Sequence, residues 1–172
     1  MLKKTFTLLA LLSLTASAQF WDVQEAPSAI YGGVGLGTIQ NLAAEDPAYQ
    51  AFLGKYWSLG EYFALNTAVE GVTDFEDSHF LDAILGLNYY PFSAGFNSIS
   101  PYIGAGGGFG AATVTNGDEW NYGFNLSGTA GLLLFRGNAV EIMLEGNLDW
   151  LFNEVVGEDN PMVWTGRIGL LF

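Results

Sequence analysis

The stretch VEIMLEGNLDWLF, residues 140–152, decides the fold because its side chains alternate in character. Nearly all of its even-numbered positions are apolar, from Val140 to Phe152, whereas the odd-numbered positions include Glu145, Asn147 and Asp149. A period of two is the pattern of a β-strand with one apolar and one polar face. The stretch therefore predicts a strand whose apolar face is covered by another element or by lipid.

The same kind of alternation recurs along the chain in segments that are separated by turn residues. The segments are 28–40, 49–59, 63–73, 79–90, 101–115, 121–135, 139–152 and 162–172. A tilted strand needs about 9 to 11 residues to cross the hydrocarbon layer, and about eight strands is the smallest usual number for such barrels. The sequence predicts an all-β fold, an eight-stranded antiparallel up-and-down transmembrane β-barrel.

The first eighteen residues have the features of a signal peptide. Lys3 and Lys4 precede a short apolar stretch, 6–14, and the small residues 16–18 offer a cleavage site. We expect export, removal of residues 1–18, and one domain, 19–172, in the outer membrane of a diderm bacterium. All 18 acidic residues but only three of the five basic ones follow residue 18, so the expected mature charge is 3 − 18 = −15. This charge excludes nucleic acid as a partner.

Aromatic residues are expected to collect at both ends of the strands, where amphipathic rings prefer the membrane interfaces. The expected inner girdle is Phe63, Tyr89, Tyr90, Phe135 and Phe172, and the expected outer girdle is Phe80, Trp120, Tyr122, Trp150 and Trp164. The girdles and a polar lumen disfavour the rival fold, a soluble lipocalin-like barrel with an apolar interior.

Two stretches resemble the family of small eight-stranded outer-membrane β-barrel proteins, which includes OmpA-like and OmpX-like barrels. Residues 101–110, PYIGAGGGFG, look like the signature of its fifth strand. The C-terminal run resembles the signal that barrel-assembly machinery recognises, and its residues are Trp164, Ile168, Leu170 and Phe172. The resemblance implies outer-membrane lipid and the assembly machinery as partners. It does not imply a function, because the family includes structural barrels and adhesins.

Polar side chains are expected to fill the barrel, since the interior of eight strands is just wide enough for side chains. Glu145 and Arg167 are predicted to be diagonal neighbours in a salt-bridged plug. The second segment is ambiguous, because turning Lys55 inward also turns Leu53 and Trp57 inward. The predicted lumen cluster is Lys55, Asn66, Asn88, Asn125, Glu145, Asn147 and Arg167.

Further inward acids are predicted at the strand ends, where water would solvate them. They are Glu70, Asp82, Glu141 and Asp149. A proton or cation relay is the alternative for these residues. The inward glycines of residues 104–110 are expected to make room for large side chains from the opposite wall.

The outer loops are acidic and contain no lysine or arginine. Clustered carboxylates invite Ca²⁺ or Mg²⁺, although no stretch has the spacing of a calcium-binding loop. The candidate cation-binding residues are Asp74, Glu76, Asp77, Glu154, Glu158 and Asp159. The loops therefore predict contact with divalent cations or with a basic partner surface.

The mature chain has a single histidine, His79, next to Ser78. Adjacent residues of a strand point to opposite faces, so the two cannot easily form a nucleophile and base. We expect a non-enzymatic barrel without cofactor, with a structural or surface-interaction role through its acidic loops. The alternatives are a narrow cation-selective channel and an enzyme that modifies lipid of the outer leaflet.

Overall fold

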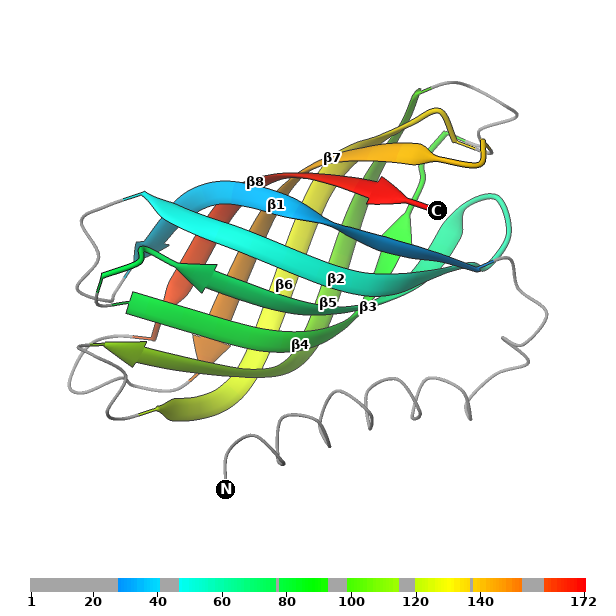
Figure 1. Cartoon of the computed structure of the whole chain (residues 1–172). Coiled ribbons are helices and arrows are strands. Elements are labelled where there is room, and N and C mark those ends of the chain that lie inside the picture. The colour runs from blue at the N-terminus through cyan, green and yellow to red at the C-terminus, as the bar shows by residue number, and fades with distance from the viewer. Residues whose placement is uncertain are drawn as a thin grey trace.

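The chain folds into one closed sheet of antiparallel strands (Figure 1), in a computed structural model that describes residues 28–40, 47–76, 78–92, 99–114, 120–136, 138–152 and 160–172. The strands are β1 (Ser28–Gln40), β2 (Ala48–Ser58), β3 (Phe63–Thr73), β4 (Ser78–Tyr89), β5 (Ile99–Val114), β6 (Asn121–Leu134), β7 (Glu141–Phe152) and β8 (Met162–Leu171). Consecutive strands pair, and β1 pairs with β8 to close the barrel. The predicted eight-stranded antiparallel barrel is confirmed.

The two ends of the barrel differ in their connections. One end, here the turn end, holds the start of β1, the end of β8 and the turns after β2 and β6. The turn after β2 is closed by a bond of 2.9 Å from the Leu59 N–H to the Phe63 carbonyl, and Gly60 has a φ of 98°, which glycine adopts without a steric penalty. The opposite end, here the loop end, joins β3 to β4. Within the described residues, no helix has the length and apolar character needed to span a membrane.

The outer face of the barrel is apolar, as expected for contact with lipid. Leu53, Ile103 and Phe109 are each more than half exposed there. Aromatic rings gather near both ends of the strands, with ring centroids 5.2 Å apart for Phe63 and Tyr89 near the turn end and 4.7 Å apart for Trp150 and Phe152 near the loop end.

Two residues predicted for the girdles lie inside the barrel instead. Phe80 is 0% exposed and Tyr90 is 1% exposed. Phe80 occupies an inward position of β4, where even-numbered residues face the interior. The Tyr90 hydroxyl accepts a hydrogen bond of 2.9 Å from Tyr56. The prediction of these two residues was wrong because an aromatic ring at a strand end can cap the interior as well as face lipid.

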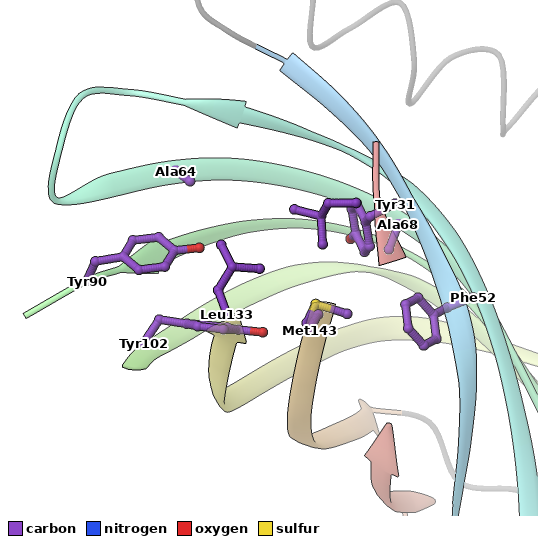
Figure 2. Packing of buried hydrophobic residues seen from close by; sticks show 9 residues of the cluster. Tyr31, Phe52, Ala64, Ala68, Tyr90, Tyr102, Leu133 and Met143 are labelled. Atoms are coloured by element: carbon purple, nitrogen blue, oxygen red, sulfur yellow. The ribbon is translucent and has the colours of Figure 1, made fainter. Parts of the chain in front are cut away.

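The interior has three layers along the barrel axis. An apolar layer near the turn end, the turn-end cluster, consists of Tyr31, Phe52, Ala64, Ala68, Tyr90, Tyr102, Leu133, Met143 and Leu171. Figure 2 shows its side chains within the curve of the sheet. A second apolar layer, the loop-end cluster, consists of Ile39, Ala48, Val72, Phe80, Ala112, Leu151 and Val163. Buried polar and charged side chains lie between the two clusters and form the candidate site.

Candidate functional site

Arg167 is at the centre of the polar layer. It occupies an inward position of β8 and is 8% exposed. Its Nη1 lies 2.6 Å from Oε1 of Glu70 on β3, and its Nη2 and Nε both bond to Oε1 of Glu145 on β7. The guanidinium carbon lies 4.7 Å from the centroid of the Phe52 ring. One buried cation therefore joins two carboxylates from different walls of the barrel.

The register corrects one detail of the prediction. Glu145 and Arg167 are directly opposite each other in the β7–β8 ladder and are not diagonal neighbours. Directly opposite side chains are closer than diagonal ones. The short separation explains why two guanidinium nitrogens reach the same carboxylate.

The network extends from Arg167 to two further strands. Gln50 on β2 donates to Oε2 of Glu70 at 2.5 Å, and the Tyr102 hydroxyl on β5 donates to Oε2 of Glu145 at 2.6 Å. Every carboxylate oxygen of Glu70 and Glu145 thus has a donor. The network thus crosses the lumen and satisfies its four carboxylate oxygens, while Oε1 of Gln50 has no hydrogen-bond partner.

The predicted inward asparagines also lie within the barrel. Asn66 donates to Asn88 at 3.0 Å near Arg167. Asn125 donates to Oδ2 of Asp82 at 2.6 Å, and Asn147 donates to Asp149 on its own strand. Six of the seven residues of the predicted lumen cluster are therefore inside; the list is Asn66, Asn88, Asn125, Glu145, Asn147 and Arg167.

The prediction was wrong for the seventh residue, Lys55, which lies on the outer face. Leu53, on the same face of β2, is 62% exposed, whereas Gln50 and Phe52 are buried inside. The Lys55 Nζ lies 5.1 Å from the centroid of the Trp57 ring. Successive residues of a strand face opposite sides, so Phe52 and Lys55, which are three positions apart, lie on opposite faces of β2. The packing of Phe52 inside therefore places Lys55 outside. Lys55 is close to the turn end of β2, so its long side chain can extend toward the membrane interface.

The predicted solvated rim of acids was also wrong for three residues. Glu70, Asp82 and Asp149 are 2%, 4% and 1% exposed. The loop-end cluster lies beyond them and closes them off from the barrel mouth. Distance from a strand end was a poor guide to solvation, because apolar side chains rather than water fill the lumen near the loop end. Glu141, at the turn end of β7, is half-buried.

The glycines of β5 make room as predicted, but mainly for side chains of the adjacent strands. A Cβ on Gly104 would meet the side chains of Asn88 on β4 and Thr129 on β6. A Cβ on Gly108 would collide with the backbone carbonyl of Ala83. The expectation of large side chains from the opposite wall was thus wrong at these two positions.

The acidic turn between β3 and β4 is held by one of the candidate cation ligands. Oδ1 of Asp74 accepts backbone N–H bonds from Glu76 at 3.0 Å and from Ser78 at 2.9 Å. Burial raises the pKa of Asp74, but these hydrogen bonds outweigh burial and leave the pKa below its ordinary value. Asp74 therefore stabilises its own turn. Four of the six predicted cation ligands lie outside the described residues; they are Asp77, Glu154, Glu158 and Asp159.

The surroundings of the acidic residues and of His79 bear on the metal-binding and catalytic hypotheses. In the part of the chain that it describes, no group of three or more histidine, cysteine, aspartate or glutamate side chains could hold a metal ion. His79 Nδ1 lies 2.8 Å from the Thr73 hydroxyl. Ser78 is fully buried on the inward face of β4, one residue away and on the opposite side.

The proposed insertion-signal residues share the outer face of the C-terminal strand. All four are exposed; they are Trp164, Ile168, Leu170 and Phe172. Two small cavities lie inside the barrel, each of about 20 Å³ and each touching Arg167. A cavity of this size holds about one water molecule.

Comparisons with known proteins point to the fold alone. No protein-family model and no curated protein matches the chain. Neisserial surface protein A (NspA) is similar in structure, with a TM-score of 0.71 and 9% identity over 84% of this chain and 95% of that one. The N-terminal β-barrel domain of Pseudomonas aeruginosa OprF has a TM-score of 0.53 and 17% identity over 84% and 97%. The outer membrane enzyme PagL has a TM-score of 0.53 and 18% identity over 81% and 97%. The chain therefore has the fold of small eight-stranded outer-membrane barrels, which carry different functions.

Proposed function

We propose that this protein is a non-conducting, non-enzymatic barrel of the outer membrane that serves envelope structure or surface contact through its loop end. The observation that carries the proposal is the filled interior. The turn-end cluster, the polar layer and the loop-end cluster follow one another along the axis. An ion crossing the barrel would have to pass two apolar layers and separate Arg167 from Glu70 and Glu145.

The arrangement supports this role over the cation channel. Each interior cavity that touches Arg167 has a volume of about 20 Å³, which is room for one water rather than for a hydrated path. An ion within the apolar layers would lose its hydration without gaining ligands, and this raises the free energy of transfer steeply.

The arrangement also supports this role over a lipid-modifying enzyme. Catalysis of acyl transfer or hydrolysis needs a nucleophile and a base within hydrogen-bonding reach. His79 and Ser78 face opposite sides of β4, and the described neighbour of His79 is the Thr73 hydroxyl. The similarity to PagL concerns the fold, so it does not assign chemistry to this chain.

Surface contact is assigned to the acidic loops because they carry one sign of charge. Residues 154, 158 and 159 are Glu, Glu and Asp, and the loop after β3 adds Glu76 and Asp77. We propose divalent cations or a basic surface as the partner of the loops. Residues 1–18 act as the export signal in this proposal, and the exposed C-terminal side chains engage the assembly machinery before the barrel inserts into outer-membrane lipid.

Conductance of the purified protein in planar bilayers tests the filled interior. The wild type is expected to be silent. A variant with Tyr102→Gly, Phe80→Gly, Leu151→Gly and Arg167→Gly removes large side chains from both apolar layers together with the central cation, and its folded fraction is expected to conduct. Discrete, cation-dependent conductance of the wild type would refute the non-conducting role.

Two further measurements test the surface role and the enzyme alternative. A variant with Glu154→Gln, Glu158→Gln and Asp159→Asn is expected to bind less to vesicles of cationic lipid, in a salt-dependent manner. Glu61→Gln, at the turn end, is the matched control and should leave binding unchanged. Equal binding by both variants would contradict a role of the loops. Loss of lipid modification in a His79→Ala strain, measured by mass spectrometry of membrane lipid, would reinstate the enzyme alternative.

A further inference from the structure

Four side chains between the Arg167 network and the loop-end cluster have an oxygen atom without a hydrogen-bond partner. Together they are named the oxygen ring: Asp82, Asn125, Asp149 and Thr165. Each is at most 5% exposed. The unpartnered atoms are Oδ1 of Asp82, Oδ1 of Asn125, Oδ1 of Asp149 and Oγ1 of Thr165. A buried acceptor without a donor is rare in folded proteins, so the ring requires an explanation.

The ring residues follow one another around the inner face of the barrel wall, from β4 through β6 and β7 to β8. Asn125 on β6 reaches Asp82 on β4 directly, with Nδ2 at 2.6 Å from Oδ2. Asn125 is opposite Leu151 in the β6–β7 ladder, which makes Asp149 its diagonal neighbour on the inner face. Diagonal neighbours lie within reach of each other's side chains.

Thr165 continues the ring on β8. It is opposite Asn147 in the β7–β8 ladder and is therefore diagonal to Asp149. Asn147 donates to Oδ2 of Asp149, so only Oδ1 of that carboxylate is left. Each aspartate of the ring thus has one oxygen held by an asparagine and one oxygen free of protein donors.

The ring also carries charge that the protein does not neutralise. Arg167 is bonded to Glu70 and Glu145, and both of those carboxylates are fully hydrogen-bonded. No basic side chain in the described structure contacts Asp82 or Asp149. Two buried carboxylates without a counter-charge are strongly unfavourable, so a cation or protons must accompany them.

The neutral oxygen of Asn125 is a further buried acceptor that a cation could bind. Asn125 is fully buried and directs its amide nitrogen to the Asp82 carboxylate. The opposite orientation of the amide would place its oxygen against that carboxylate, so Oδ1 must remain an acceptor. Protonation of the aspartates would also remove their charge, and each protonated carboxyl could donate to a free acceptor such as Oδ1 of Asn125, so the calcium-retention experiment below distinguishes a cation from protons. A divalent cation would neutralise both carboxylates and would need the neutral oxygens as further ligands.

We propose that the oxygen ring binds one Ca²⁺ ion, with Asp82 and Asp149 as charged ligands and Asn125 and Thr165 as neutral ones. Carboxylate, amide and hydroxyl oxygens are hard ligands, and two carboxylates match a divalent charge. Ca²⁺ accepts six to eight oxygens in flexible geometry, whereas Mg²⁺ demands a small octahedron and keeps its waters. The ring holds only two carboxylates, so it differs from centres built from three or more acidic, histidine or cysteine ligands, of which the described residues contain none.

The layers on either side of the ring make the site a closed one. Phe80, Leu151 and Val163 are fully buried on the loop side, and the Arg167 network lies on the other side. The ion therefore enters while the barrel folds and leaves slowly afterwards. Chelator added to the folded protein removes little Ca²⁺, whereas chelator present during folding prevents loading.

Metal retention after refolding tests the site. The full chain is unfolded in urea and refolded in detergent with either CaCl₂ or EDTA, transferred into EDTA, and analysed for calcium by mass spectrometry. The Ca²⁺-refolded wild type is expected to retain one ion per chain. Asp82→Asn and Asp149→Asn are each expected to retain about one tenth of that calcium or less, because each substitution removes a charged ligand. Glu76→Gln, an exposed acid of the loop end, is the matched control and should retain the ion.

Other outcomes overturn the proposal. If the wild type retains no calcium and the double variant Asp82→Asn, Asp149→Asn folds equally well, protons neutralise the ring. If Glu76→Gln loses calcium to the same extent as the ring variants, the ion is bound at the loops. Asn125→Asp guards against variants that fail to fold: an added carboxylate is expected to raise retention of calcium, and unchanged or lower retention would count against the ring.

Discussion

Replacement of Arg167 by methionine is the most direct test of the polar layer. The substitution keeps much of the side-chain volume but removes the basic group that pairs with Glu70 and Glu145 in the described structure. Removal of one partner from a buried ion pair costs about 3–5 kcal/mol, because it leaves an uncompensated charge. Two pairs share this guanidinium and their energies are not additive, so we expect Arg167→Met to lower the free energy of unfolding by about 4–7 kcal/mol.

The assay is equilibrium unfolding by urea in phospholipid vesicles, followed by tryptophan fluorescence, with the folded fraction checked by heat-modifiable migration in gels. The control is the triple variant Glu70→Gln, Glu145→Gln, Arg167→Met, which has no charge left to compensate. It should recover to within about 2 kcal/mol of the wild type, since a neutral replacement of a buried ion pair is often tolerated. A loss below about 1 kcal/mol in the single variant, or no recovery in the triple variant, would refute the reasoning.

Three further substitutions test local features. Asp74→Ala should lower the free energy of unfolding by about 1–3 kcal/mol at neutral pH. Because the native pKa of Asp74 lies below the ordinary value of about 3.9, the advantage of the wild type should persist above that value and vanish as the pH falls through the native pKa. An advantage that grows in acid would contradict this role of Asp74. Gly108→Ala should lose about 1–3 kcal/mol because the new Cβ meets the Ala83 carbonyl, whereas the matched Gly128→Ala, with nothing within 4 Å, should be neutral in the same urea assay. Lys55→Leu should keep or raise stability in vesicles by up to about 2 kcal/mol, since Lys55 is on the outer face; a strong loss would put it back inside the barrel.

The strands could be predicted from the sequence because alternation and membrane thickness constrain them together. Residues 140–152 alternate so regularly that the inward set of β7 follows from it, and Glu145, Asn147 and Asp149 are indeed buried. The register of Arg167 against Glu145 could not be predicted, since it depends on how the last hairpin pairs. A shift of two residues would preserve every face and change every contact.

The faces of β2 and the depths of the acids show where a sequence pattern fails. In β2 both faces are partly apolar, and only the packing of Phe52 against Arg167 decides that Lys55 faces outward. The depth of Asp82 and Asp149 was misjudged because the pattern does not reveal which layer closes the barrel. Phe80 and Leu151 do so, and each belongs to a strand whose acid was expected to be solvated at the strand end.

The remaining question is how so narrow a lumen accommodates its large side chains, and the answer is a pairing of size across neighbouring strands. Large inward side chains lie over inward glycines of the next strand, where a Cβ would collide with them. The pairs are Tyr31 over Gly54, Asn66 over Gly86, Asn88 over Gly104 and Tyr102 over Gly131. Each glycine therefore frees space for particular neighbouring side chains rather than widening the lumen. Because the volume is matched locally, the barrel can be rich in glycine and still have a filled interior. Replacement of a glycine should therefore displace its partner side chain rather than open or close a path for water.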